Sequence, residues 1–337
     1  GRYPGRMHGR TSHLQSRSGA RVLLFVADLG ATGVVRNAIA LANHLSGEGH
    51  RVTLATCRAE GVLRCQVDLG VDVVELLPPG SSRAARPLEL LRSLGAYRAH
   101  LGALRPDIIV SAGNHGHMLT RLAASAAPGA RVVYRVSNDL DHMLAGKPGS
   151  RVKRILRRAQ FGFIARGADR LALVSPHLLR HPLVAARRAA GKVRLIPNGV
   201  DMESVRAGAC GGCRHAWLQG KGPPTLVAIG RFAAQKNFTT LIRALAVAQA
   251  RRPVRLVLIG EGSSTRRERL VEEARRLGVA GALDIVPPVP NPFPWMAKAS
   301  ALVLPSWWEG SSNVLLEALA CGTPVVASNS AGNAAPP

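Results

Sequence analysis

The sequence predicts an α/β protein with two doubly wound domains that face each other across a cleft. Two observations predict this class. Short apolar runs alternate with stretches of helical periodicity along most of the chain, a pattern typical of parallel sheets covered by helices. The chain of 337 residues, 47% of them hydrophobic and 19% charged, is long and apolar enough to bury two cores.

The first series of elements follows residues 1–19, which hold four arginines and no acidic residue and which we expect to be a disordered leader. Residues 22–27 form an apolar run, followed by a turn of small residues and by helical spacing over 34–45. This succession predicts a strand, a loop and a helix. Further strands are expected at 51–56, 71–76, 107–111, 131–135, 170–174 and 193–196.

The second series begins after strong turn residues. Residues 196–201 read Ile-Pro-Asn-Gly-Val-Asp, and residues 202–224 are irregular and rich in Gly, which predicts a domain boundary. We therefore expect one domain over 20–198 and a second over 199–337. Its hydrophobic pattern stops after residue 327, so the second domain is expected to be incomplete. The expected strands are 225–229, 254–259, 283–286, 301–304 and 324–327, and the expected helices are 238–250, 264–277 and 313–320.

The composition is strongly basic, with 45 Lys and Arg against 20 Asp and Glu, a net charge of +25 that attracts anionic partners. The densest cluster, Arg151–Arg166, interleaves cations with apolar residues. Such a pattern is typical of a basic amphipathic helix on an anionic membrane surface, and arginines on a solvated helix face are the alternative. No nucleic-acid motif accompanies the charge, so nucleic acid is not an expected partner.

The chain has no apolar run near the roughly 18 residues of a spanning helix and no signal-peptide pattern. We therefore expect a cytoplasmic protein that contacts the inner face of the cytoplasmic membrane through Arg151–Arg166. The five cysteines, an odd number in a chain with no export signal, are expected to be reduced thiols.

Two clusters contain residue types that bind metal ions in other proteins. Cys210 and Cys213 lie close to His215, but no second pair of ligands has suitable spacing. Asp139 and Asp141 supply fewer oxygen ligands than a hard cation prefers, and we expect them to cap a helix or form a turn. The sequence therefore predicts no metal.

Ligands of parallel sheets bind beyond the carboxyl ends of the strands, where two loops carry charged residues. The loop after 225–229 holds Arg231 and Lys236, two cations suited to a diphosphate and to the charge on a departing phosphate. The loop after 301–304 holds Glu309 and leads into a helix with Glu317. Backbone amides at the start of that helix, which suit a phosphate, belong to Ser311, Ser312, Asn313 and Val314.

Three motifs, in this order, resemble the family 4 glycosyltransferases. They are Gly230-Arg231 through Lys236, Leu258-Ile-Gly-Glu-Gly262, and Glu309-Gly-Ser-Ser-Asn-Val-Leu-Leu-Glu317 with the residues up to Ala327. The resemblance implies the GT-B fold, in which two Rossmann-like domains face a cleft and the first lies on the acceptor side. It also implies a nucleotide-diphosphate sugar donor in the second domain and retention of anomeric configuration without a metal or another cofactor.

The resemblance also implies roles for single residues. Arg231 and Lys236 hold the diphosphate, Glu309 holds the donor sugar and phosphate together with the amides from Gly310 onward, and Glu317 binds the ribose. The departing phosphate oxygen accepts the acceptor's proton, so no protein base is required.

In the first domain, the loop with Gly30 and Gly33 resembles the glycine-containing loop of the family, which approaches the donor phosphate. His115, which follows the strand at 107–111, is a candidate to orient a hydroxyl, and an exposed loop histidine is the alternative. Relatives carry a histidine nearer this strand, where the chain has Ala112 and Gly113. The candidate catalytic residues are Glu309, Arg231, Lys236 and His115.

These observations predict a retaining glycosyltransferase that acts on a lipid-linked or polysaccharide acceptor in cell-envelope or exopolysaccharide biosynthesis. A UDP-sugar is the first expected donor and GDP-mannose the second. Two alternatives remain open: a nucleotide-sugar-binding fragment without turnover, and a basic nucleic-acid-binding protein.

Overall fold

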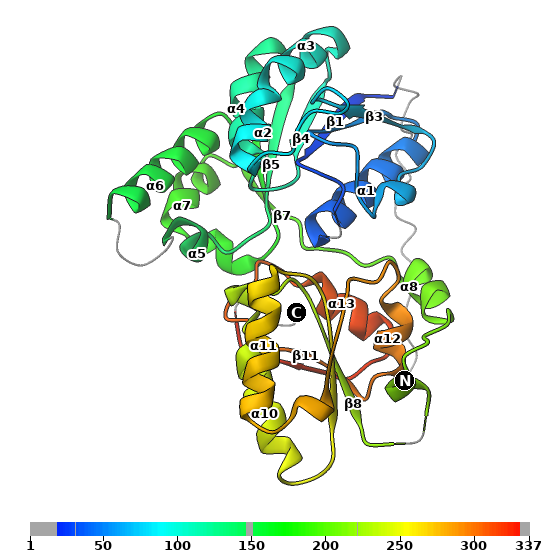
Figure 1. The fold of residues 1–337 in the computed structure, drawn as a ribbon. Helices are drawn as coiled ribbons and strands as arrows, with labels where there is room; N and C mark the ends of the chain where they lie inside the picture. Colours follow the sequence, from blue (N-terminus) through cyan, green and yellow to red (C-terminus); the bar gives the residue numbers. More distant parts are fainter. Residues whose placement is uncertain (1–18, 31, 146–150, 221, 331–337) are drawn as a thin grey trace, which may run out of the picture.

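The computed structural model describes residues 19–30, 32–145, 151–220 and 222–330, which form two parallel sheets (Figure 1). The first sheet has the strand order β3-β2-β1-β4-β5-β6-β7 and the second the order β10-β9-β8-β11-β12. In both sheets the strand order reverses beside the first strand, and such a reversal creates a ligand site at the carboxyl strand ends. The two doubly wound α/β domains expected from the sequence are confirmed.

The first sheet is covered by helices on both faces. Alternate residues of its central strand β1 point to opposite sides: Leu23 and Phe25 pack with Tyr97 of α3, and Leu24 packs with Ile39 of α1. The strands are β1 (Arg21–Val26), β2 (Arg51–Thr56), β3 (Val71–Glu75), β4 (Ile108–Ser111), β5 (Arg131–Val136), β6 (Arg170–Leu173) and β7 (Val193–Leu195). The helices are α1 (Gly33–Gly47), α2 (Arg86–Arg92), α3 (Leu94–Leu104), α4 (His117–Ala123), α5 (Leu140–Ala145), α6 (Arg151–Arg166) and α7 (Pro182–Ala189).

The second sheet is built in the same way. The apolar face of α10, which includes Leu241 and Leu245, packs with α11 on one side of the sheet, and α9, α12 and α13 pack on the other. The strands are β8 (Thr225–Ile229), β9 (Arg255–Ile259), β10 (Leu283–Val286), β11 (Ala301–Leu304) and β12 (Val325–Ala327). The helices are α8 (Met202–Ala209), α9 (Ala216–Gln219), α10 (Phe238–Gln249), α11 (Ser264–Arg276), α12 (Phe293–Lys298) and α13 (Asn313–Ala320).

The connection between the sheets is more regular than the sequence suggested. The expectation of an irregular segment over 202–224 was wrong, because α8 and α9 lie there. Asp201 caps α8 by accepting hydrogen bonds from the backbone N–H groups of Glu203 and Ser204, each 3.0 Å long. Val205 then buries its side chain. The high Gly content hid this helix from the hydrophobic pattern.

The expected leader at residues 1–19 lies outside the described residues except for Gly19. Among the described residues, no helix has both the length and the apolar content needed to cross a bilayer.

Candidate functional site

Lys236 and Glu309 form an ion pair at the carboxyl ends of two neighbouring strands of the second sheet. Lys236 Nζ lies 2.6 Å from Glu309 Oε1, and the two side chains are only 15% and 8% exposed. Lys236 comes from the turn after β8 and Glu309 from the loop after β11. Gln235 joins the same loops by donating to Trp308 O (2.9 Å) and Glu309 Oε2 (3.3 Å). The pairing of β8 with β11 therefore brings together two predicted site residues that lie 73 positions apart in sequence.

The loop after β11 leads into the N-terminus of α13. Ser312 stands at the N-cap position, but its side chain makes no capping hydrogen bond, and its buried Oγ has no partner among the described residues. The first N–H groups of α13 are therefore not capped by this side chain and carry the positive end of the helix dipole. The predicted amides of Ser311 to Val314 lie at this end of the helix, in the loop and first turn that follow Glu309.

Glu317 lies one turn into α13 and faces the first domain. Arg36 Nη1 of α1 lies 4.0 Å from Glu317 Oε1, with side chains 22% and 12% exposed. Burial raises the pKa of Glu317, and the positive charge of Arg36 opposes this effect. The sequence analysis did not identify Arg36.

Asn313, the first residue of α13, connects this helix to the first domain. Its Nδ2 donates to Gly33 O (3.1 Å) and to Asn37 Oδ1 (3.1 Å), while Asn198 Nδ2 donates to Asn313 Oδ1 (2.5 Å) and to Ser311 O (3.1 Å). A Cβ at position 33 would lie 2.8 Å from Asn313 Nδ2, so this contact requires glycine there. Gly33 therefore lies against the start of α13.

The other glycine of the loop has a local role. Gly30 donates its backbone N–H to Asp28 Oδ1 (3.0 Å), and Thr32 caps α1 by accepting a 3.3 Å hydrogen bond from Val35 N. No contact between Gly30 and the second domain is seen among the described residues. Asp28 also pairs with Arg86 at 2.5 Å.

The Gly-Glu-Gly motif after β9 shapes the loop that carries Arg231. A Cβ at Gly260 would lie 1.9 Å from the carbonyl oxygen of Gly230, and one at Gly262 would lie 2.6 Å from Cβ of Phe232. Phe232 also donates its backbone N–H to Glu261 O (2.6 Å). The motif therefore lets the loops after β8 and β9 approach closely, and Arg231 remains exposed beside them.

His115 is exposed in the turn between β4 and α4. Partial desolvation by the surrounding protein disfavours the charged imidazole and lowers the pKa of His115. The positive charges of Arg86 and Arg231 lower this pKa further. His117 is different: it is buried, its Nδ1 lies 2.8 Å from Ser111 Oγ, and burial lowers its pKa to about 3.

A second contact between the domains lies beside Glu309. The ring of His142 stacks on that of Trp308, with centroids 4.2 Å apart and an interplanar angle of 7°. Asp139 Oδ1 accepts from the backbone N–H of His142 (2.9 Å) and from its Nδ1 (3.0 Å), which fixes the start of α5. Asp139 therefore caps a helix, as predicted, and Asp141 lies in the first turn of the same helix.

The residues at the Cys210 motif do not gather into a ligand set. Cys213 is buried, Cys210 is exposed, and both are free thiols. His215 Nε2 instead lies 2.9 Å from Asp284 Oδ2. Within the described part of the chain, no group of three or more His, Cys, Asp or Glu side chains is arranged to hold a metal ion.

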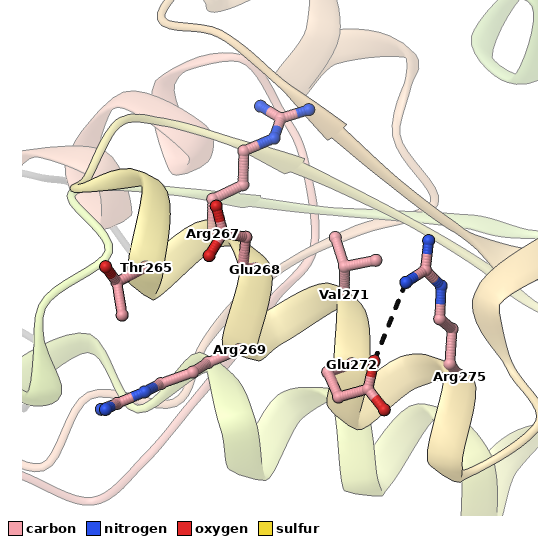
Figure 2. Close-up of a pocket in the computed structure, with 7 residues that line it drawn as sticks. All are labelled: Thr265, Arg267, Glu268, Arg269, Val271, Glu272 and Arg275. Carbon is pink, nitrogen blue, oxygen red and sulfur yellow. Dashed lines mark ion pairs between the residues drawn. The ribbon is translucent and has the colours of Figure 1, made fainter.

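A pocket elsewhere in the second domain lies along α11 (Figure 2). All seven lining residues come from that one helix, and two of them, Glu272 and Arg275, form an ion pair at 3.8 Å. None of the predicted site residues lines it. The strand ends, and not this pocket, therefore carry the candidate site.

Comparison with known proteins shows the family of the chain. Residues 31–204 match the family described as Glycosyltransferase Family 4, and residues 223–336 match Glycosyl transferases group 1. A D-inositol 3-phosphate glycosyltransferase of Kribbella flavida is 37% identical over 175 residues, which are 49% of this chain and 41% of the relative. The lipopolysaccharide core biosynthesis glycosyltransferase LpsE of Rhizobium meliloti is 38% identical over 110 residues, 32% of this chain and 31% of the relative. The matches thus span less than half of these relatives.

Solved structures share the architecture. Sucrose-phosphate synthase from Thermosynechococcus elongatus has a TM-score of 0.72 at 20% identity, covering 92% of this chain and 82% of that one. Anabaena HepE in complex with UDP-glucose has a TM-score of 0.70 at 18% identity, covering 93% and 81%. WaaG, a glycosyltransferase involved in lipopolysaccharide biosynthesis, has a TM-score of 0.67 at 17% identity, covering 93% and 82%. At these identities the likeness shows the fold alone.

Proposed function

Since this chain belongs to glycosyltransferase family 4, we propose that it transfers a sugar from a nucleotide-diphosphate donor to an acceptor hydroxyl. The observation that carries the proposal is the meeting of Lys236, Glu309 and the N-terminus of α13 at adjacent strand ends. A cation, a carboxylate and unfilled backbone donors are the groups that a phosphorylated sugar requires. The ion pair holds the Glu309 carboxylate in place before the donor binds.

The donor's diphosphate would lie on the amides of residues 311–314, with Lys236 and Arg231 beside it. These cations lower the barrier because they stabilise the negative charge that grows on the departing phosphate. Glu309 would accept hydrogen bonds from sugar hydroxyls, and Glu317 from the ribose. The departing phosphate oxygen takes the acceptor's proton on the same face of the sugar, so the reaction retains anomeric configuration and needs no metal.

A UDP-sugar is the first donor to test, and GDP-mannose the second. The solved HepE complexes, which contain UDP or UDP-glucose, support this order because they share the fold. The alternative of a nucleotide-sugar-binding chain without turnover shares the same site and differs only in product formation.

The proposed acceptor is a lipid-linked or saccharide hydroxyl in cell-envelope or exopolysaccharide biosynthesis, at the inner face of the cytoplasmic membrane. The lipopolysaccharide roles in the names of LpsE and WaaG support this class. So does α6, where Val152, Ile155 and Leu156 are 66%, 64% and 62% exposed and lie among exposed cations. Apolar side chains flanked by arginines suit the boundary between headgroups and acyl chains.

The test is a purified-chain assay with UDP-glucose, UDP-N-acetylglucosamine and GDP-mannose, in which thermal stabilisation and release of the nucleoside diphosphate are both measured. Stabilisation and nucleotide release that disappear in Glu309→Gln would support the proposal. Arg131→Gln, on an exposed strand start, is the matched control and should behave as the wild type. Stabilisation without release would favour the binding-only alternative. Salt-sensitive binding of DNA or RNA with no effect of any nucleotide sugar would favour the nucleic-acid binder.

A further inference from the structure

Arg135 is partly buried at the boundary between the two domains, and its guanidinium has no anionic partner among the described residues. Arg135 lies near the carboxyl end of β5, on the strand face opposite to the buried Val132, Tyr134 and Val136. Its Nη2 donates to Asn198 Oδ1 (2.5 Å), while its buried Nη1 has no hydrogen-bond partner among the described residues. Burial lowers the pKa of Arg135 to about 10, and no carboxylate opposes that effect. The group is therefore still charged at neutral pH.

A structural role does not explain this charge. Within the described part of the chain, the one hydrogen bond of the guanidinium goes to a neutral amide, for which any neutral donor would serve. A buried charge without a counterion destabilises the folded state, because the lost hydration is not replaced. The natural complement of Arg135 is thus an anion that is not part of the described chain.

The position of Arg135 indicates which anion it binds. Asn198, its partner, also donates to Ser311 O and Asn313 Oδ1 at the start of α13. Asn198 thus links the guanidinium of Arg135 to the N-terminus of α13, where the helix dipole favours negative charge. The planar fork of a guanidinium matches two oxygens of a phosphate, and a sugar hydroxyl would leave the charge uncompensated.

We infer that Arg135 binds a phosphate group at the boundary between the domains, as a cation from the first domain that adds to Arg231 and Lys236. The inference rests on the proposed function, because the phosphate belongs either to the donor's diphosphate or to a phosphorylated acceptor. Both sources present the same chemistry to Arg135.

The experiment compares the wild type with Arg135→Gln and Arg135→Lys by calorimetric titration, using uridine, UDP, GDP, pyrophosphate and inorganic phosphate. Gln keeps a donor for Asn198 and removes the charge, and Arg131→Gln on the same strand is the matched control. If the donor supplies the phosphate, Arg135→Gln weakens UDP about 10-fold or more and leaves uridine unchanged. If the acceptor supplies the phosphate, Arg135→Gln binds UDP with the affinity of the wild type. The UDP-saturated variant then no longer binds inorganic phosphate, whereas the UDP-saturated wild type does.

A thermal melt separates ligand binding from a structural role. Without phosphate, Arg135→Gln should melt at or above the wild-type Tm, since it removes an uncompensated charge. A lower Tm would overturn the inference, as would wild-type affinity of Arg135→Gln for every phosphate probe. If the wild type binds pyrophosphate through Arg135 but neither UDP nor GDP, the proposed function fails and the inference stands. Absence of phosphate binding in the wild type would overturn both.

Discussion

Arg36 of α1 and Glu317 of α13 lie 4.0 Å apart, one on each side of the boundary between the two sheets. This pair joins the first domain to the residue proposed to hold the donor's ribose. Burial raises the pKa of Glu317, and Arg36 partly offsets the cost of its charge. The proposed ribose contact and the contact between the domains therefore share one carboxylate.

The first prediction concerns the stability of Glu317→Gln. A carboxyl whose pKa is raised by folding binds more protons in the folded state, so stability falls as pH rises from its unfolded pKa through its folded pKa. We expect Glu317→Gln to have a higher Tm than the wild type at pH 7.5, with the difference shrinking toward pH 4. Thermal melts across this range test it. A variant less stable than the wild type at pH 7.5 would show that Arg36 overcompensates the burial.

The same variant should bind nucleotide more weakly. A neutral amide is a poorer acceptor for ribose hydroxyls than a carboxylate, so we expect an affinity for UDP or GDP about 10-fold lower. Calorimetric titration measures this change. Equal loss of affinity for pyrophosphate, which has no ribose, would place Glu317 at the phosphates instead.

The Lys236–Glu309 pair should contribute strongly to the stability of the loops that follow β8 and β11. Lys236→Met leaves the Glu309 carboxylate buried and unpaired, and we expect the free energy of unfolding to fall by about 3 kcal/mol. Lys236→Met with Glu309→Gln should recover a large part of that loss. Denaturant unfolding of the wild type, Lys236→Met, Glu309→Gln and the double variant gives the four free energies of unfolding of a double-mutant cycle. Losses that simply add would mean that the two side chains do not interact in solution.

Gly33 should be necessary for the contact between domains. In Gly33→Ala the new Cβ would lie 2.8 Å from Asn313 Nδ2, so the Asn313 side chain must shift and its hydrogen bonds to Gly33 and Asn37 are disturbed. We expect weaker nucleotide binding and a larger radius of gyration in solution scattering. Gly47→Ala, at the other end of α1, is the control because its Cβ meets nothing within 4 Å. A similar effect in both variants would indicate a change in the helix and not in the contact.

The exposed face of α6 should bind anionic vesicles. Ile155→Ser with Leu156→Ser removes apolar area, and Arg154→Glu with Arg158→Glu reverses charge; each charge lost near the surface weakens binding about 5-fold. Cosedimentation with phosphatidylglycerol vesicles measures both. Leu69→Ser, a fully exposed leucine elsewhere in the first domain, is the matched control. Unchanged binding in both double variants would favour the reading of α6 as a solvated arginine-rich helix.

Hydrophobic patterning predicted most elements because each strand of a parallel sheet is a short apolar run of its own. The strands Arg51–Thr56, Thr225–Ile229 and Ala301–Leu304 and the helix Asn313–Ala320 have the predicted bounds. Helix α8 was missed because its stability comes from the Asp201 cap and from packing of Val205, and neither produces a hydrophobic period.

The candidate donor-site residues could be named from the sequence because each group lies within one short loop or helix whose motif resembles the family 4 glycosyltransferases. The roles of Arg36, Asn198 and Arg135 could not be derived in that way. Their importance comes from contacts with α13 or with one another over separations of 63 to more than 100 residues. Local sequence determines which elements form and which loops carry charge. The packing of one sheet against the other decides which charges meet, since it depends on the summed contacts of both domains and not on any single segment.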